Sequence, residues 1–271
     1  MQKIHKTSPR RLRWQCRISP TLGGGFAGTP NEVWGTKDYT DSTQPTVFFG
    51  CYGLPDLFAV RQHKGRKAIL WAGTDITYLL NGYWLDDTGK QRLDPKIVGA
   101  YLNENVEHWC ENDLERIELA SVGIKAKVCP SFLGDVSKVK PSYRPTENKR
   151  AYISVSGDDF KAYGWDKLDA WAREFPSITF YCYGNRKPWK SKYKNIIVRG
   201  RVPQEVMNKE IKDMQIGMRL NEHDGFSEIL AKAVLMEHDV VSLIDYPFLD
   251  MNRKKARAWL LKNVNKYPWA K

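Results

Sequence analysis

One stretch of the chain, residues 216–241, constrains the fold more than any other. A short apolar segment leads into a polar turn, His223-Asp224-Gly225, and an uninterrupted helix-forming run begins at Phe226 or Ser227. Glycine permits a sharp turn of the backbone, and Asp224 or Ser227 can cap the helix. A second apolar strand pattern follows the helix. The order strand, turn, helix, strand is the repeating unit of a parallel α/β sheet.

The start of this predicted helix is also a candidate anion site. The first N–H groups of a helix have no partner within it, and the helix dipole is positive at this end. Such groups bind a diphosphate well. The residues at this helix start are Gly225, Phe226, Ser227 and Glu228.

Length and composition restrict the class of protein. A chain of 271 residues forms one or two domains with ample material for a core. No apolar run approaches the length of a membrane span, and the basic N-terminus lacks the apolar segment of a signal peptide. The five cysteines occur singly in or near apolar segments, without the spacing of a zinc site. We therefore expect reduced structural thiols in a cytoplasmic protein, which for a viral protein means the host cytoplasm.

The charge of the chain is unusual for a soluble metabolic enzyme. The formal net charge is +12 and the isoelectric point is about 9.4. An excess of this size indicates an anionic partner, either nucleic acid or an acidic membrane surface. No obligate protein partner is evident.

Two segments concentrate the basic residues. Six cations lie between Lys3 and Arg17, and no acid precedes Glu32. The segment 175–204 also lacks acids, and aromatic residues are interleaved with its cations. Cations that track phosphates and rings that stack on bases are typical of a nucleic-acid groove, whereas a solvated loop with local ring packing is the alternative. The candidate contacts in this second cluster are Arg186, Lys187, Trp189, Lys190, Lys192 and Tyr193.

Strand and helix patterns alternate along both halves of the chain. In the first half we predict strands at 46–50, 67–71, 106–110 and 125–129, with helices at 55–63, 94–102 and 112–121. In the second half we predict strands at 151–155, 178–183, 195–198, 216–220 and 240–243, with helices at 165–175, 205–214, 226–236 and 252–263.

A segment rich in Gly, Ser, Pro and Lys at 131–148 separates the two alternations. The predicted fold class is α/β, with two Rossmann-like domains that face each other across a cleft. We assign residues 1–140 to an N-terminal domain and 141–271 to a C-terminal domain with a terminal helix. In such folds ligands bind at the carboxyl ends of the strands.

The order Arg-Leu-x-x-His-Asp-Gly-Phe-Ser, before a small and apolar helix, resembles the donor-site segment of retaining GT-B glycosyltransferases. Segments 163–168, 175–184 and 198–203 are similar to further parts of the donor domain of that family. Segment 69–75 is similar to the loop of its N-terminal domain that faces the transferred sugar. The resemblance extends from about residue 45 to 250. It implies that residues 1–140 form the acceptor-side domain and residues 141–271 the nucleotide-sugar-binding domain. It also implies a nucleotide-sugar co-substrate, for which a UDP-sugar is the favoured choice, and no bound cofactor.

The donor motif departs from the family at one position. The family carries two glutamates, one for the sugar hydroxyls and one for the ribose diol. Asp224 and Lys232 stand at these positions here. An ammonium group cannot accept hydrogen bonds from a diol, so nucleotide binding must differ. Glu228 lies one turn earlier and can substitute, although an ion pair with Lys232 is the simpler interpretation.

The resemblance also suggests roles for residues near the reaction. Lys161 and Arg219 are candidate ligands of the departing diphosphate, which requires positive charge. For Arg219, an ion pair with a nearby acid is the alternative. The chain contains no Asp-x-Asp, so we expect metal-independent transfer. Asp75 is a candidate positioning group or base, with helix capping as the alternative, and His223 a candidate hydrogen-bond donor to sugar or phosphate, with a local turn contact as the alternative. The loop Gly23, Gly24 and Gly25 resembles the Gly-rich loop of the family that approaches donor phosphate or acceptor, with a generic Gly-rich surface turn as the alternative.

Three hypotheses follow for the function. The first is a glycosyltransferase that decorates a hydroxylated base in DNA, as phage-type DNA glycosyltransferases do, which requires a flipped base. The second is a glycosyltransferase for a lipid-linked or surface glycan at an anionic membrane. The third is a GT-B-like binding module that has lost its nucleotide site.

Overall fold

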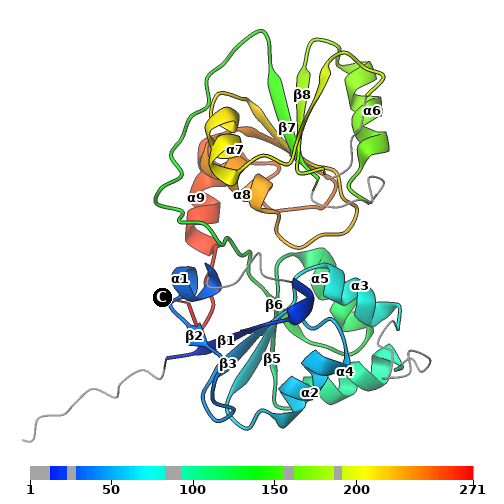
Figure 1. Cartoon of the computed structure of the whole chain (residues 1–271), viewed down its shortest axis with the longest axis vertical. Helices are drawn as coiled ribbons and strands as arrows, with labels where there is room; N and C mark the ends of the chain where they lie inside the picture. The colour runs from blue at the N-terminus through cyan, green and yellow to red at the C-terminus, as the bar shows by residue number, and fades with distance from the viewer. Residues whose placement is uncertain (1–12, 23–28, 83–92, 156–161, 186–190, 271) are drawn as a thin grey trace, which may run out of the picture.

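The computed structural model describes residues 13–22, 29–82, 93–155, 162–185 and 191–270. Two lobes lie one above the other along the long axis of the molecule, and each lobe is a sheet with helices on its faces (Figure 1). Every strand pairing within the described residues is parallel. The predicted fold class, two Rossmann-like α/β halves, is confirmed.

The N-terminal half contains a six-stranded sheet with the order β2-β1-β3-β4-β5-β6. Its central strands are short apolar runs buried on both faces, as in other parallel sheets covered by helices. The strands are β1 (Gln15–Ile18), β2 (Lys37–Asp38), β3 (Thr46–Phe49), β4 (Lys67–Leu70), β5 (Glu107–Cys110) and β6 (Ala126–Val128). The helices are the 3-10 turn Pro20–Leu22, α1 (Thr29–Trp34), α2 (Leu54–Gln62), α3 (Thr74–Leu80), α4 (Pro95–Asn103) and α5 (Asp113–Ser121).

The C-terminal half contains a five-stranded sheet with the order β11-β10-β7-β8-β9. Its strands are β7 (Arg150–Ser154), β8 (Thr179–Tyr183), β9 (Ile196–Gly200), β10 (Ile216–Arg219) and β11 (Asp239–Ser242). Its helices are α6 (Trp165–Glu174), α7 (Gln204–Ile211), α8 (Glu228–Leu235) and α9 (Arg253–Asn263). Helix α8 is almost fully buried, so its apolar sequence is core rather than surface.

The strands and helices predicted from residue 46 onward all form, with ends shifted by a few residues. Four described elements of the N-terminal half were not predicted: β1, the 3-10 turn Pro20–Leu22, α1 and the two-residue strand β2. Helix α3 was also missed, because its first residues were interpreted as the tip of a loop. Asn112 caps α5, the helix predicted at 112–121, since its side chain accepts the N–H of Glu115 at 2.9 Å.

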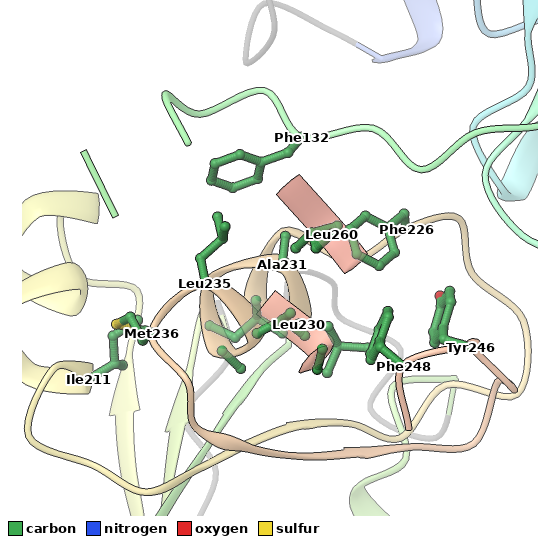
Figure 2. Packing of buried hydrophobic residues seen from close by; sticks show 14 of the residues in the cluster. Phe132, Ile211, Phe226, Leu230, Ala231, Leu235, Met236, Tyr246, Phe248 and Leu260 are labelled. Atoms are coloured by element: carbon green, nitrogen blue, oxygen red, sulfur yellow. The ribbon is translucent and has the colours of Figure 1, made fainter. Parts of the chain in front are cut away.

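The largest core cluster surrounds α8 and holds the start of this helix in place. Phe226 packs among Tyr246, Phe248 and Leu260, while Phe132 from the segment that joins the halves lies over the same cluster (Figure 2). The Phe226 and Tyr246 rings meet edge to face, 5.4 Å between centroids. The turn before α8 is therefore anchored by a buried aromatic ring.

The chain returns to the N-terminal half after α9. Helix α9 itself packs against α8 through Ala256 and Leu260. The following tail places Tyr267 and Trp269 against Trp34 in the aromatic core beside β1 and β3. In Figure 1 the C-terminal end accordingly lies beside α1 in the lower lobe. Both the joining segment and the tail cross between the halves.

All five cysteines are buried and unpaired, as expected for structural thiols. Within the described parts of the chain, helices fall short of the length and apolarity needed to cross a bilayer.

Candidate functional site

The turn between β10 and α8 lies where the two halves meet. Gly225 does not adopt a positive φ here, so its importance comes from close approach rather than from backbone conformation. A Cβ atom at this position would lie 2.1 Å from Oε2 of Glu111 in the N-terminal half. From the N-terminal half, Gly73 approaches the same turn, and a Cβ atom at Gly73 would lie 2.8 Å from the backbone nitrogen of Gly225. Two glycines thus permit the halves to touch.

Arg219 and Asp224 form an ion pair across this turn. Nε of Arg219 donates to Oδ2 of Asp224 at 2.6 Å, and Nη1 donates to the carbonyl of Ser154 at 2.8 Å. The guanidinium also lies over the Tyr163 ring, 5.2 Å from its centroid. The structure therefore gives Arg219 an acidic partner from its own turn, and holds the Asp224 carboxylate in a defined orientation.

Glu111 reaches the start of α8 from the other half. Its Oε2 accepts the backbone N–H of Phe226 at 2.6 Å, and its Oε1 accepts the hydroxyl of Ser131. A carboxylate at this position satisfies one of the N–H groups that the sequence predicted as part of an anion site. Ser227 occupies the N-cap position of α8, but its side chain makes no capping hydrogen bond.

Carbonyl groups of the same turn are also held from both sides. Nδ2 of Asn112 donates to the carbonyl of Asp224 at 2.8 Å, and the hydroxyl of Tyr246 donates to the carbonyl of Gly225 at 2.6 Å. The turn is thus fixed by donors and acceptors from β5–α5 and from the C-terminal half.

His223 bridges the halves rather than making a local turn contact. Its Nε2 lies 2.8 Å from Oε2 of Glu118, and its Nδ1 lies 3.2 Å from Oγ1 of Thr77. The hydrogen bond to Glu118 raises the pKa of His223 above its usual value. An imidazole with both nitrogens engaged is oriented, and it favours the protonated form.

Asp75, the candidate positioning group or base, is enclosed within the N-terminal half. The residue is fully buried at the start of α3. Its carboxylate accepts the N–H groups of Cys51, Ala72 and Ile76 at 2.9 to 3.0 Å. Burial raises its pKa to about 7, although these bonds oppose the shift. Asp75 therefore links the residues that follow β3 and β4. It also accepts an N–H group at the start of α3, which is close to the helix-capping alternative.

Glu228 and Lys232 lie one helical turn apart at the start of α8. Oε1 of Glu228 accepts the N–H of Leu133 at 2.7 Å. Lys232 is 7% exposed, and burial lowers its pKa while the charge of Glu228 opposes the shift. The two opposite charges therefore influence each other, and the Glu228 carboxylate is directed to the joining segment.

Glu111 and Glu115 form a buried acidic pair beside the turn. Oε2 of Glu115 accepts the N–H of Glu111 at 2.6 Å, while Oε1 of Glu115 has no hydrogen-bond partner. Burial raises the pKa of Glu111 to about 8 and raises that of Glu115 further above its usual value. Asp224 adds to both shifts by charge repulsion. At least one of these carboxyls is therefore protonated at neutral pH.

A first cavity, about 310 Å³, opens beside this turn between the halves. It lies at the carboxyl ends of β7 and β10, where ligands bind in doubly wound sheets. Its lining includes Glu111, Ser154, Arg219, Asp224, Ser227 and Glu228. The structure thus brings six of the predicted donor-site residues to one cavity, namely Arg219, Asp224, Gly225, Phe226, Ser227 and Glu228.

Several predicted contacts lie outside the described residues, namely Gly23, Gly24, Gly25, Lys161, Arg186, Lys187, Trp189 and Lys190. Of the basic cluster, Lys192 and Tyr193 are described. The ammonium of Lys192 lies 5.1 Å from the centroid of the Tyr193 ring, and this ring packs against the core of the C-terminal half. In the N-terminal run, Arg17 pairs with the buried Asp56 at 2.6 Å. These cations have structural partners.

Four residues of the N-terminal half that touch the turn were not predicted as site residues: Thr77, Glu111, Asn112 and Glu118. Each lies more than a hundred positions from its partner in the sequence. A spacing pattern cannot reveal such pairs, because only the closing of the halves brings them together.

By sequence, the chain matches no known protein family and no curated protein. Solved structures nevertheless share its fold. A TarM mutant from S. aureus, solved with fondaparinux, alpha-GlcNAc-glycerol and UDP, superposes with a TM-score of 0.52 at 15% identity over 80% of this chain and 48% of TarM.

Two further structures come from other glycosyltransferases of GT-B fold. Sucrose-phosphate synthase from Thermosynechococcus elongatus has a TM-score of 0.52 at 10% identity, covering 73% of this chain and 55% of its own. A UDP-forming trehalose-phosphate synthase from Burkholderia xenovorans has 0.51 at 10%, covering 81% and 69%. The chain spans about half the length of the TarM structures. Its fold is that of GT-B glycosyltransferases.

Proposed function

We propose that this chain is a nucleotide-sugar-dependent glycosyltransferase that moves a sugar onto a hydroxyl group. The observation that carries the proposal is the Arg219–Asp224 ion pair on the turn before α8, at the wall of a cavity between two GT-B halves. In the glycosyltransferase family that the sequence resembles, the corresponding turn holds the donor. UDP occurs in the TarM complex, and the trehalose-phosphate synthase is UDP-forming. A UDP-sugar is therefore the first donor to test.

The proposed roles follow from the positions of the groups. The Asp224 carboxylate accepts hydrogen bonds from sugar hydroxyls. The N–H groups of Ser227 and Glu228, with the Arg219 guanidinium, face the diphosphate, since Glu111 already holds the N–H of Phe226. Lys161 is a further proposed phosphate ligand.

The proposed transfer is a substitution at the anomeric carbon and needs neither a metal nor a redox partner. The acceptor oxygen forms a bond to the anomeric carbon, and the bond from this carbon to the diphosphate oxygen breaks. The electron pair leaves with the nucleoside diphosphate, and the acceptor proton passes to it. We propose that the transfer is metal-independent and retains the anomeric configuration, as the family resemblance implies.

Lys232 changes how the ribose is held. A buried ammonium beside Glu228 offers no acceptor to a diol, and the Glu228 carboxylate already receives the N–H of Leu133. We therefore propose that the ribose gains its hydrogen bonds from other groups and that nucleotide affinity is modest. Calorimetry with UDP measures this affinity. Absence of any nucleotide binding would leave a GT-B-like binding module as the better description.

For the acceptor, the net charge of +12 supports a hydroxylated base in DNA. If about half of the thirteen cations in the two basic segments contact phosphates, log–log plots of affinity against salt should have a slope of roughly −5 or −6 on duplex DNA. Mass spectrometry of nucleosides from hydroxymethylated DNA, incubated with the chain and a panel of nucleotide sugars, tests the transfer directly. Unmodified nucleosides and salt-insensitive binding would contradict the DNA acceptor.

A different observation favours the second candidate, a sugar hydroxyl of a glycan. A second cavity of about 710 Å³ lies between the halves, and its lining includes Thr77, Tyr78 and His223, whose side chains carry groups that can hydrogen-bond sugar hydroxyls.

A further inference from the structure

The turn between β10 and α8 is held against the N-terminal half by two groups that can gain or lose a proton. On one side, His223 of the turn bonds Glu118 of α5, with 2.8 Å between Nε2 and Oε2. On the other side, Glu111, which follows β5, accepts the backbone N–H of Phe226 at 2.6 Å. Both contacts join one half to the other, so both hold the halves together.

The His223 contact is strongest when the imidazole is protonated, because a hydrogen bond between two charged groups is stronger than one with a neutral ring. Hydrogen bonding to Glu118 raises the pKa of His223, although burial opposes the shift. If the halves part, the ring loses both Glu118 and Thr77, since both belong to the N-terminal half. The other charged groups beside the ring, four acids and one cation, are Asp75, Asp166, Glu222, Asp224 and Lys167.

Glu111 and Glu115 are buried against the same turn. A Cβ atom at Gly225 would meet Oε2 of Glu111 and would lie 3.5 Å from Oε1 of Glu115, so both carboxyls face this glycine of the C-terminal half. Among the described residues, neither carboxyl forms an ion pair with a lysine or an arginine. An unpaired buried charge is costly, and a carboxyl in this position takes up a proton instead.

The charged groups of the C-terminal half do not supply the missing cation. Asp224 and Glu228 add to the upward pKa shift of Glu111 by charge repulsion. Arg219 is bonded to Asp224, and Lys232 has Glu228 as its acidic neighbour. Docking of the turn therefore brings acids rather than free cations toward Glu111.

Two further cations lie near the pair. Arg116 is bonded to Asp113 at 2.7 Å. Lys266 shares a cavity of about 160 Å³ with Glu111 and Asp245, but it forms no ion pair with a described residue. The remaining titratable neighbours carry no positive charge, namely Asp75, Cys110, Cys129, Tyr52, Tyr246 and Tyr267.

His223 and Glu111 respond to pH in the same direction. With the halves apart, water reaches both side chains, and their pKa values approach the ordinary 6.5 and 4.5. With the halves closed, both pKa values are higher, that of Glu111 reaching about 8. Each contact is therefore complete at low pH and weakens as pH rises, for His223 above 6.5 and for Glu111 between 4.5 and about 8.

We propose that closure of the two halves is linked to protons: His223 and Glu111 take up protons when the turn before α8 docks on the N-terminal half, and release them when the halves part. Rising pH then opens the molecule. The inference does not depend on the proposed glycosyl transfer, since the contacts involve this chain alone. It does imply that the turn that carries Asp224 is fully assembled only in the closed form.

The test measures the distance between the halves by fluorescence energy transfer in the full chain, without ligand. Ala100→Cys on α4 and Ala170→Cys on α6 supply exposed label sites, because all five native cysteines are buried. Helices α4 and α6 lie on the same side of the two lobes, opposite α9 (Figure 1). Glu111→Gln removes one linked proton, and Glu118→Gln removes the carboxylate that faces the imidazole. Glu205→Gln, on the exposed side of α7, is the matched control.

We expect the open-to-closed ratio of the wild type and of Glu205→Gln to rise from about pH 6 to about pH 8.5, by up to roughly tenfold per pH unit for each linked proton. Glu111→Gln should stay closed to a higher pH, and Glu118→Gln should open at a lower pH. The double variant should lose the pH dependence.

Two results would overturn the proposal directly: a wild-type distance that does not change with pH, or a change that persists undiminished in the double variant. Far-UV circular dichroism at each pH checks the folded state. Loss of helix in parallel with the change in distance would assign the effect to unfolding, and would overturn the proposal as well.

Discussion

The carboxylate of Glu111, in the N-terminal half, accepts the backbone N–H of Phe226, in the C-terminal half, at 2.6 Å. Phe226 is in turn packed in the core around α8. The contact therefore links the end of one sheet to the core of the other through a single turn. Asn112 and His223 add hydrogen bonds between the halves on either side of it. The position of the turn, and of Asp224 on it, depends on both halves.

Gly225→Ala should disturb this contact directly. Its Cβ would lie 2.1 Å from Oε2 of Glu111, which is buried and cannot move away freely. Overpacking of this kind costs about 1–3 kcal/mol. Gly53→Ala is the control, because its Cβ has only an ordinary contact, 3.9 Å from Cδ of Pro55. Urea unfolding measures both, and equal midpoints would show that Gly225 has room for a methyl group.

Glu111→Gln should change how stability depends on pH. Burial raises the pKa of Glu111 from 4.5 to about 8, so the native state favours the protonated form. Below pH 4.5 the carboxyl is protonated both folded and unfolded, and its contribution to stability is intact. Between pH 4.5 and 8 the unfolded chain ionises first, and stability falls as pH rises. Glutamine does not titrate and mimics the protonated form.

The measurement is the melting temperature of wild type and variant from pH 5 to 8. The stability of Glu111→Gln relative to wild type should rise with pH, by at most about 1.4 kcal/mol per unit. Glu205→Gln, on the exposed side of α7, should run parallel to the wild type. Parallel curves for Glu111→Gln as well would mean that this carboxyl titrates normally.

Strand β1 shows why the sequence predicted the N-terminal half less completely than the C-terminal half. Its residues include Gln15 and Arg17, which are polar and hydrogen-bonded to other side chains or backbone groups: Gln15 accepts the N–H of Thr40 at 2.6 Å, and Arg17 pairs with Asp56. A strand held by such side-chain bonds lacks the apolar run that marks β3 or β10. Hydrophobic patterning therefore finds core strands and misses this one.

The candidate site was also predicted only in part from the sequence. The turn from Arg219 to Glu228 is contiguous, so its glycine, acid and helix start form a pattern that can be recognised. Asn112 shows the limit. Its role as the cap of α5 follows from local sequence, but its second hydrogen bond, to the carbonyl of Asp224, depends on how the halves pack. Tertiary contacts between distant segments have no counterpart in local spacing.

Asp224→Asn should separate sugar binding from nucleotide binding. The amide keeps the size of the side chain but loses the charge that faces Arg219 and the proposed sugar hydroxyls. Hydrogen bonds to a charged group contribute about 1.5–3 kcal/mol each, so UDP-sugar affinity should fall roughly 10- to 100-fold. UDP alone should bind as before. Calorimetry with both ligands decides the matter, and equal losses for the two would remove Asp224 from the sugar subsite.

The Asp224→Asn experiment has two controls, the folded state of the variant and a second variant. Arg219 keeps its bond to the carbonyl of Ser154 and its contact with Tyr163 in the variant, so the fold should persist. Glu210 lies on α7, away from both cavities, and pairs with Arg199. Glu210→Gln removes this acid. It should leave UDP-sugar binding unchanged.

Trp269→Ala should destabilise the N-terminal half, although the residue follows the last helix of the C-terminal half. Trp269 is 4% exposed, stacks on Tyr267 at 4.7 Å, and meets Trp14 and Trp109 at 5.7 Å. Truncation of a buried tryptophan costs about 3–5 kcal/mol. Because its neighbours lie beside β1 and β3, hydrogen exchange should accelerate in these strands. Trp259→Ala, which removes a ring packed on Phe248, should instead accelerate exchange around α8. Unchanged exchange in β1 and β3 for Trp269→Ala would show that the tail does not brace the N-terminal half.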